Sequence, residues 1–305
     1  MRYVLWESFR AVFYTPYYAA LSLGTLEEQG LDIEFGAVPA GVHFGEALRS
    51  GQAHVVWGGP MRVMLDRHEH PESDTMCFCE VVARDPFYLI GREPRPDFQL
   101  ADLLRLRVGT VSEVPTPWMC LQEDLRRAGL DPAAVQRVAD RSMAENVAAL
   151  GEGELDVVQL FEPDTQRLTS AGAGHIWYAA ARRGLTSYTT LYATKRFLAD
   201  QPDVASGFVR GIYAAQRWVA AYSAEQLAEL VADYFPGLQR AILSGAIRRY
   251  LDNEVWGKTP LLSREGFERQ AASLASGGLI GRQPAYEECV DMRFVEQVLG
   301  ETKTT

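Results

Sequence analysis

The stretch of sequence that decides the fold lies within residues 13–33 and reads Phe13-Tyr14-Thr15-Pro16-Tyr17-Tyr18-Ala19-Ala20, then Leu23-Gly24-Thr25-Leu26-Glu27-Glu28-Gln29-Gly30-Leu31-Asp32-Ile33. Proline fits the first turn of a helix and glycine fits the position just past its end, so the stretch predicts a helix over Pro16–Gln29. Apolar residues on either side predict strands over Tyr3–Trp6 and Asp32–Phe35. A strand, a helix and a second strand in this order are typical of an α/β protein.

The same alternation continues along the chain in two series. The first series adds predicted strands over Ala53–Trp57, Thr75–Ala83 and Pro86–Ile90, with helices over Phe44–Arg49 and Pro60–Arg67. The second adds strands over Leu106–Thr110, Val135–Val138, Leu155–Leu160 and His175–Tyr178, with helices over Pro117–Ala128, Met143–Leu150 and Pro163–Ser170. An extended segment, Thr189–Thr194, is followed by predicted helices over Val204–Tyr222, Ala224–Tyr234, Leu238–Leu251 and Arg264–Ala275.

Two such series predict two lobes. The chain would cross between them near Ala83–Arg95 and again near Arg183–Thr190. We expect residues 1–85 plus 190–305 to form the first lobe and residues 86–189 to form an inserted second lobe, each a mixed sheet flanked by helices. A hinged clamshell of this kind binds its ligand in the cleft, at strand ends and helix amino termini.

Composition narrows the class of protein. The 305 residues are 47% hydrophobic and 23% charged, enough apolar content for more than one lobe and too much for a disordered chain. The net charge is −10, and the Lys and Arg residues are scattered, so we expect no nucleic-acid partner. Four cysteines in a chain of this length do not indicate a disulfide scaffold. We expect a monomer or a weak dimer.

The amino terminus bears on location. Met1 to Trp6 leads directly into Glu7, without the basic region, apolar stretch and small-residue cleavage site of a signal peptide. As the sequence stands we expect a cytoplasmic protein, and a periplasmic or lipid-anchored one if a leader was removed. No apolar run approaches the ~20 residues that a membrane-spanning helix needs.

Several phrases resemble one known family in the same order. After the opening stretch come Glu46 to Val55, Gly58-Gly59-Pro60, Leu103 to Thr110, Ala149 to Val158 and Lys195 to Pro202. Together they resemble the ABC-transporter solute-binding proteins of the nitrate, sulfonate and thiamine-precursor group, over about the first 220 residues. The resemblance implies the type II periplasmic-binding-protein fold, a small organic ligand held between two lobes, an ABC permease as partner and no cofactor.

The loops that such a fold directs into its cleft contain the candidate ligand-binding residues. They are Trp6, Tyr14, Tyr17, His43, Gly58, Gly59, Ser112, Glu113, Thr116, Phe161, Glu162 and Tyr188. Aromatic rings suit a flat ligand, glycines allow close backbone approach, and hydroxyls beside helix N–H groups suit an anionic or carbonyl-bearing ligand. Glu162 would bind an amine or a ring N–H. Alternatively, the aromatic residues belong to the core and the hydroxyls only cap helices.

Enzymes on the same fold are the alternative. Thiamine-pyrimidine synthases carry a Lys and a His at positions that are Gly58 and Arg62 here, and Gly184–Thr190 lacks their cysteines, so no lysine is placed for a pyridoxal-phosphate Schiff base. Aryl-sulfinate desulfinases resemble the chain at Val42-His43-Phe44 and Trp57-Gly58-Gly59, but their nucleophilic Cys falls near Ala11 and their Arg at Val56. His43 and Glu162 would be the acid–base candidates of such an enzyme, which would act on a small aromatic or heterocyclic acid.

A final pattern concerns metals. His68, His70, Cys77 and Cys79 have a composition that suits zinc. The two cysteines alternate in a predicted strand and would point together into a core, and the histidines fall in a polar loop. We therefore predict no metal site.

Overall fold

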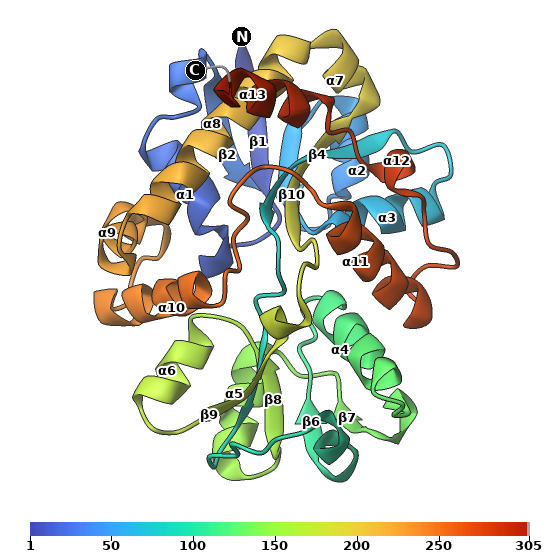
Figure 1. The fold of residues 1–305 in the computed structure, drawn as a ribbon, viewed down its shortest axis with the longest axis vertical. Coiled ribbons are helices and arrows are strands. Elements are labelled where there is room, and N and C mark those ends of the chain that lie inside the picture. Colours follow the sequence, from blue (N-terminus) through green and yellow to red (C-terminus); the bar gives the residue numbers. More distant parts are fainter. Residues whose placement is uncertain (304–305) are drawn as a thin grey trace.

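The computed structural model describes residues 1–303, which form two lobes joined by two extended crossings (Figure 1). The first sheet has the order β2-β1-β3-β10-β4 and contains Asp32–Ala37, Arg2–Glu7, Val55–Gly58, Thr189–Thr194 and Thr75–Val82. The second has the order β7-β6-β8-β5-β9 and contains Gln136–Val138, Arg107–Gly109, Val157–Leu160, Tyr88–Gly91 and His175–Ala179.

Both sheets are mixed. In the first, β1 pairs in parallel with β2 and β3, while β10 is antiparallel to β3 and β4. In the second, β6 pairs in parallel with β7 and β8, while β5 is antiparallel to β8 and β9. The antiparallel member of each sheet, β5 or β10, is the strand that the chain enters directly after a crossing. This confirms the predicted fold class of two mixed sheets flanked by helices. The lobe boundaries at residues 85/86 and 189/190 remain a proposal.

The helices flank these sheets (Figure 1). Those of the first half of the chain are α1 (Thr15–Ser22), α2 (Phe44–Ser50), α3 (Pro60–Glu69), α4 (Thr116–Arg127), α5 (Met143–Glu152) and α6 (Asp164–Ser170). Those of the second half are α7 (Lys195–Asp200), α8 (Pro202–Ala221), α9 (Ala224–Leu230), α10 (Arg240–Asp252), α11 (Arg264–Ser276), α12 (Tyr286–Cys289) and α13 (Arg293–Lys303). The sequence reading missed α7, α12 and α13.

The predicted helix over Pro16–Gln29 is wrong in its length. Helix α1 ends at Ser22, Gly24 adopts a left-handed φ of 71°, and a short 3-10 turn over Glu27–Gln29 follows. The break lets Thr25 reach α8, where its hydroxyl donates to the Gly211 carbonyl at 2.8 Å. A tertiary contact therefore overrides the local helix signal.

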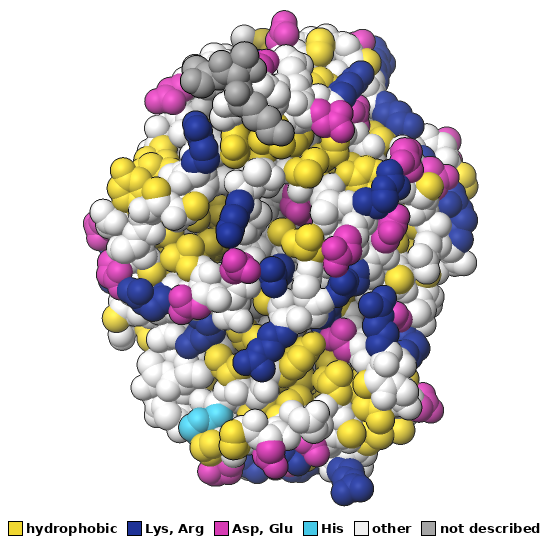
Figure 2. Space-filling model, viewed as in Figure 1, with side chains coloured by type: hydrophobic (Ala, Val, Ile, Leu, Met, Phe, Trp, Pro, Cys, Tyr) yellow, Lys and Arg dark blue, Asp and Glu magenta, His cyan; other side chains and the backbone are white. Residues whose placement is uncertain are grey.

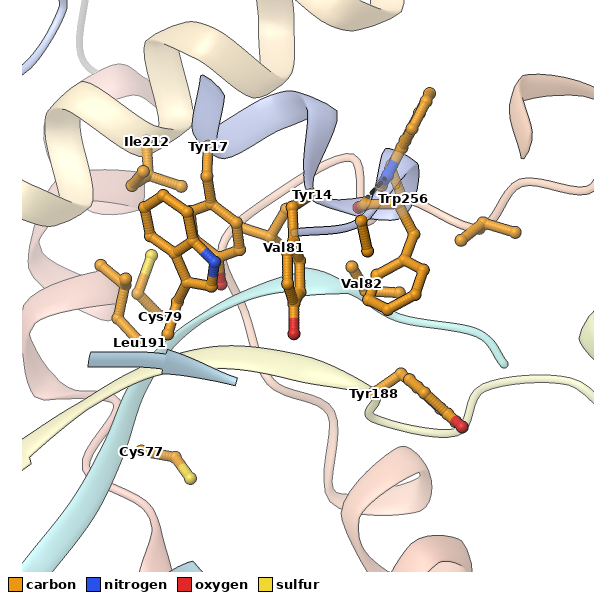
Figure 3. Packing of buried hydrophobic residues seen from close by; sticks show 14 of the residues in the cluster. Tyr14, Tyr17, Cys77, Cys79, Val81, Val82, Tyr188, Leu191, Ile212 and Trp256 are labelled. Carbon is orange, nitrogen blue, oxygen red and sulfur yellow. Dashed lines mark hydrogen bonds between the residues drawn. The ribbon is translucent and has the colours of Figure 1, made fainter. Parts of the chain in front are cut away.

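Most of the main apolar core lies in the first lobe, where α1 and α8 cover β3, β4 and β10 (Figure 3), and the core continues into the second lobe through Ile90, Val158 and Leu160. Tyr17 stacks on Trp57 with ring centroids 4.4 Å apart, and the indole N–H of Trp256 donates to the Phe13 carbonyl at 2.8 Å. Among residues 1–303, no helix has the length and apolar character needed to cross a bilayer. Charges of both signs are interspersed on the face shown in Figure 2.

Candidate ligand site

The candidate site lies where loops of the two lobes meet. Parallel strands β1, β2 and β3 all end at one edge of the first sheet, and β6 ends at the facing edge of the second. The segments that follow these strands line an outer cavity of about 440 Å³. Its walls include Ser8, Pro39 and His43 from the first lobe and Glu113, Val114 and Pro115 from the second. Ligands of α/β proteins bind at this kind of edge.

A smaller inner pocket, of about 30 Å³, continues from the outer cavity toward the crossings. The two share Met61, Arg62 and Val114. The inner pocket is mostly aromatic, with polar groups contributed by few residues, and is lined by Phe9, Phe13, Tyr14, Gly59, Phe87, Thr116, Tyr188 and Thr189 in addition to the shared three. Its size suits a small group of a ligand rather than a whole ligand.

Arg62, on α3, is the cation at the junction of the two spaces. Its side chain is half-buried, and within residues 1–303 it makes neither a hydrogen bond nor an ion pair. The nearby Tyr14 hydroxyl interacts with Ser8 at 3.0 Å. Burial raises the pKa of Tyr14 to about 12, although Ser8 and Arg62 oppose that rise. A half-buried guanidinium without an acceptor is an unfilled binding group for an anion.

Two buried tyrosine hydroxyls add unpartnered groups to the same walls. Tyr188 lines the inner pocket and Tyr192 lines the outer cavity, and neither hydroxyl has a hydrogen-bond partner among the residues that the structure describes. Both side chains are buried, and an unsatisfied buried hydroxyl costs about 1–3 kcal/mol. Gly58 makes room for one of them, since a Cβ atom there would lie 2.7 Å from the Tyr192 hydroxyl. A polar ligand atom would satisfy these groups.

His43 lies in the wall of the outer cavity beside a buried acid. Its Nδ1 lies 3.8 Å from Oδ1 of Asp66, which is fully buried on α3. The other carboxylate oxygen of Asp66 accepts hydrogen bonds from Thr75 at 3.2 Å, from Arg49 at 3.3 Å and from Ser73. The acid partner that sequence spacing could not identify for His43 is therefore present, 23 residues away along the chain.

Half of the predicted site residues line these two spaces. They are Tyr14, His43, Gly59, Glu113, Thr116 and Tyr188. The residues that the prediction missed include Ser8, Arg62, Asp66, Glu69 and Tyr192. Helical spacing is the signal that could have found three of these, because Arg62, Asp66 and Glu69 recur at one face of a predicted helix.

The other predicted residues lie elsewhere. Trp6 packs against Gly36 of the neighbouring strand, and Tyr17 is buried against Trp57. The exposed Ser112 donates its backbone N–H to Arg141. Phe161 packs behind the inner pocket, with its ring 5.4 Å from that of Phe13.

Glu162 is buried and faces α10 rather than either space. Arg249 forms an ion pair with the Glu162 carboxylate. The backbone N–H of Glu162 donates to the Tyr250 hydroxyl at 3.0 Å. Burial raises the pKa of Glu162, and Arg249 opposes that rise. In this conformation the carboxylate is occupied by a protein cation.

The metal-like pattern is divided between core and surface. Cys77 and Cys79 are fully buried on β4, whereas His68 and His70 are exposed at the end of α3. No group of three or more His, Cys, Asp or Glu suited to a metal occurs among residues 1–303.

Comparison with known proteins agrees with this architecture. Residues 97–233 match the model of the NMT1-like family. The protein of Bacillus subtilis (strain 168) named "Putative binding protein YtlA" is 25% identical over 297 residues, covering 97% of this chain and 89% of that protein.

Two solved structures are similar in fold. The periplasmic aliphatic sulphonate binding protein SsuA from Escherichia coli superposes with a TM-score of 0.76 at 18% identity, covering 96% of this chain and 92% of that chain. The desulfurization enzyme DSZB superposes with a TM-score of 0.72 at 15% identity, covering 99% of each. The chain therefore has the type II periplasmic-binding-protein fold, and its predicted resemblance to the NMT1-like family is confirmed, with residues 97–233 matching the family model.

Proposed function

We propose that the protein is a solute-binding protein that captures a small organic anion with a flat or apolar body between its lobes. The observation that carries the proposal is Arg62, a half-buried cation without an acceptor at the junction of two spaces. The unpartnered hydroxyls of Tyr188 and Tyr192 lie in the same walls and supply further donors. The proposed contacts predicted from sequence are Tyr14, His43, Gly59, Glu113, Thr116 and Tyr188.

The size and lining of the site suit that ligand. The outer cavity falls within the range of about 300–1,000 Å³ that small-molecule sites occupy. Val38, Val42, Phe44 and Leu65 supply apolar walls for the ligand body, and the inner pocket would admit one small group. The likeness to a sulphonate-binding protein and to a binding protein agrees with capture rather than conversion, and an ABC permease would be the partner.

The test compares anionic with neutral ligands of the same shape. Benzenesulfonate and benzoate should raise the melting temperature and bind in calorimetry, whereas benzamide should not. Arg62→Gln should weaken anion binding about tenfold or more, because a charge-assisted hydrogen bond contributes about 1.5–3 kcal/mol. Arg217→Gln, an exposed arginine on α8, is the matched control and should bind like the wild type. Absence of binding by either anion, or tight binding that survives Arg62→Gln, would contradict the proposal.

An enzyme is the second candidate, favoured by the pairing of His43 with Asp66 in the cavity wall. The four cysteines are buried and line neither space, so a thiol nucleophile has no place beside His43. Incubating the protein with each bound ligand and then measuring the mass of the ligand by mass spectrometry decides between a binding protein and an enzyme. An unchanged ligand supports binding, and a converted one supports catalysis.

A further inference from the structure

Helix α3 presents one continuous face to the outer cavity. Arg62, Leu65, Asp66 and Glu69 all line it, at the spacing i, i+3, i+4 and i+7 that places side chains on a single helix face. Seven residues along a helix correspond to about 10 Å of axial rise. The face therefore carries a cation at its amino-terminal end and a carboxylate at its carboxyl-terminal end.

Neither charge stabilises the helix. The helix macrodipole favours anions at the amino terminus and cations at the carboxyl terminus, and each mismatch costs roughly 0.3–1 kcal/mol. Arg62 lies in the first turn of α3 and Glu69 is its last residue, so both charges oppose the macrodipole. Neither has an ion-pair partner among residues 1–303. The placement of these two charges is explained better by a ligand that binds in the outer cavity than by the stability of α3.

The second lobe contributes another carboxylate to the same space. Glu113, in the segment between β6 and α4, lines the outer cavity and accepts the Met143 backbone N–H at 2.8 Å, but it pairs with no cation in residues 1–303. Asp66 adds a third acid, fully buried, whose Oδ1 has no hydrogen-bond partner in the described structure. The other ionisable groups in the wall are His43, which faces Asp66 at 3.8 Å, and the buried Tyr192, whose pKa is raised by burial. Away from Arg62, the cavity is therefore rich in acceptors for a positive charge.

We infer that the ligand is zwitterionic, with its anionic group at Arg62 and a protonated amine at Glu69 and Glu113. This rests on the proposed function and names the ligand class of the same site. An acid with an uncharged tail would leave the two carboxylates unpaired, and a dianion would be repelled by them. Specificity would come from this repulsion as much as from the new ion pair.

Three ligands built on the same three-carbon chain test the inference by calorimetry at neutral pH: 3-aminopropanesulfonate, propanesulfonate and propane-1,3-disulfonate. The wild type should bind the aminosulfonate at least about fivefold more tightly than propanesulfonate, the order expected of one partly exposed ion pair, and the disulfonate most weakly. The double variant Glu69→Gln/Glu113→Gln should lose this preference while its affinity for propanesulfonate stays unchanged or rises.

Glu152→Gln is the matched control, because Glu152 is an exposed carboxylate that ends helix α5 as Glu69 ends α3. It should keep the preference. Equal affinity for the amino and uncharged ligands, or a preference for the disulfonate, would overturn the zwitterion inference and leave anion capture at Arg62 standing. Failure of all three sulfonates to bind, together with benzenesulfonate and benzoate, would instead overturn the proposed function.

Discussion

Glu80 is a carboxyl group buried within the first lobe, on β4, and it lines neither the outer cavity nor the inner pocket. Burial raises its pKa to about 8, and the nearby Ser187 only partly opposes that rise. The group is therefore protonated in the folded protein at pH values where the unfolded chain has already released its proton. At the scale of single residues, such a group links stability to pH.

The free energy of unfolding should fall as the pH rises from about 4.5 to about 8. The contribution of protonated Glu80 is fully present below the lower value and is lost by the upper one, with a slope of up to about 1.4 kcal/mol per pH unit. Glu80→Gln, which stays neutral, should remove most of that slope. Urea denaturation at a series of pH values between these two limits measures the slope. An unchanged slope in the variant would show that Glu80 does not titrate as described.

At the scale of elements, the packing of α8 on the segment after α1 determines where α1 ends. Gly211 of α8 approaches that segment so closely that a Cβ atom would lie 2.9 Å from the Thr25 carbonyl oxygen and 3.1 Å from the Leu26 Cα atom. Both neighbours are backbone atoms that cannot move aside by a rotamer change.

Gly211→Ala should therefore destabilise the protein by about 1–3 kcal/mol, although alanine has the higher helix propensity. Gly151→Ala in α5 is the matched control, because a Cβ atom there meets nothing within 4 Å. It should stabilise by about 0.5–1 kcal/mol. Chemical denaturation should give changes in the free energy of unfolding of opposite sign for the two variants if α8 packs as described. Changes of the same sign would contradict that packing.

At the scale of the whole molecule, polar contacts connect the lobes on both sides of the crossings. Helix α10 lies above α6, and α11 lies beside α4 (Figure 1). Arg249 of α10 pairs with Glu162 and donates to Gln166 at 2.7 Å. On the other side, the Ser276 hydroxyl at the end of α11 donates to Glu123 of α4 at 2.7 Å.

Arg249→Leu should destabilise the protein by about 3–5 kcal/mol, because it leaves the buried Glu162 carboxylate without its cation. Adding Glu162→Gln should restore part of the loss. Arg248→Leu, on the same helix as Arg249, removes an exposed pair with Glu225 of α9 and should cost less than about 1 kcal/mol. If the Arg248 and Arg249 variants lose similar amounts of stability in thermal or urea unfolding, the described connection between the lobes is contradicted.

Local features account for what the sequence predicted well. The capping box of Ser142 with Glu145 and the left-handed Gly153 at the other end bound α5, where a helix was expected. The fully buried β4 and β10 contain runs of apolar residues that read as strands. The end of α1 could not be read in this way, because a contact to Gly211, 186 residues distant, decides it.

The sequence by itself determined the order of the strands, most of the helices and the mixed α/β class, because caps, turns and hydrophobic periodicity act between near neighbours. Only the tertiary structure decided which side chains in those loops are free to bind. Glu162, predicted at the cleft, is paired with Arg249 across 87 residues, whereas Arg62, which the sequence left without a role, makes no hydrogen bond or ion pair within the described part of the chain. Charge pairing depends on distance in space, and that distance exists only once the two lobes have packed.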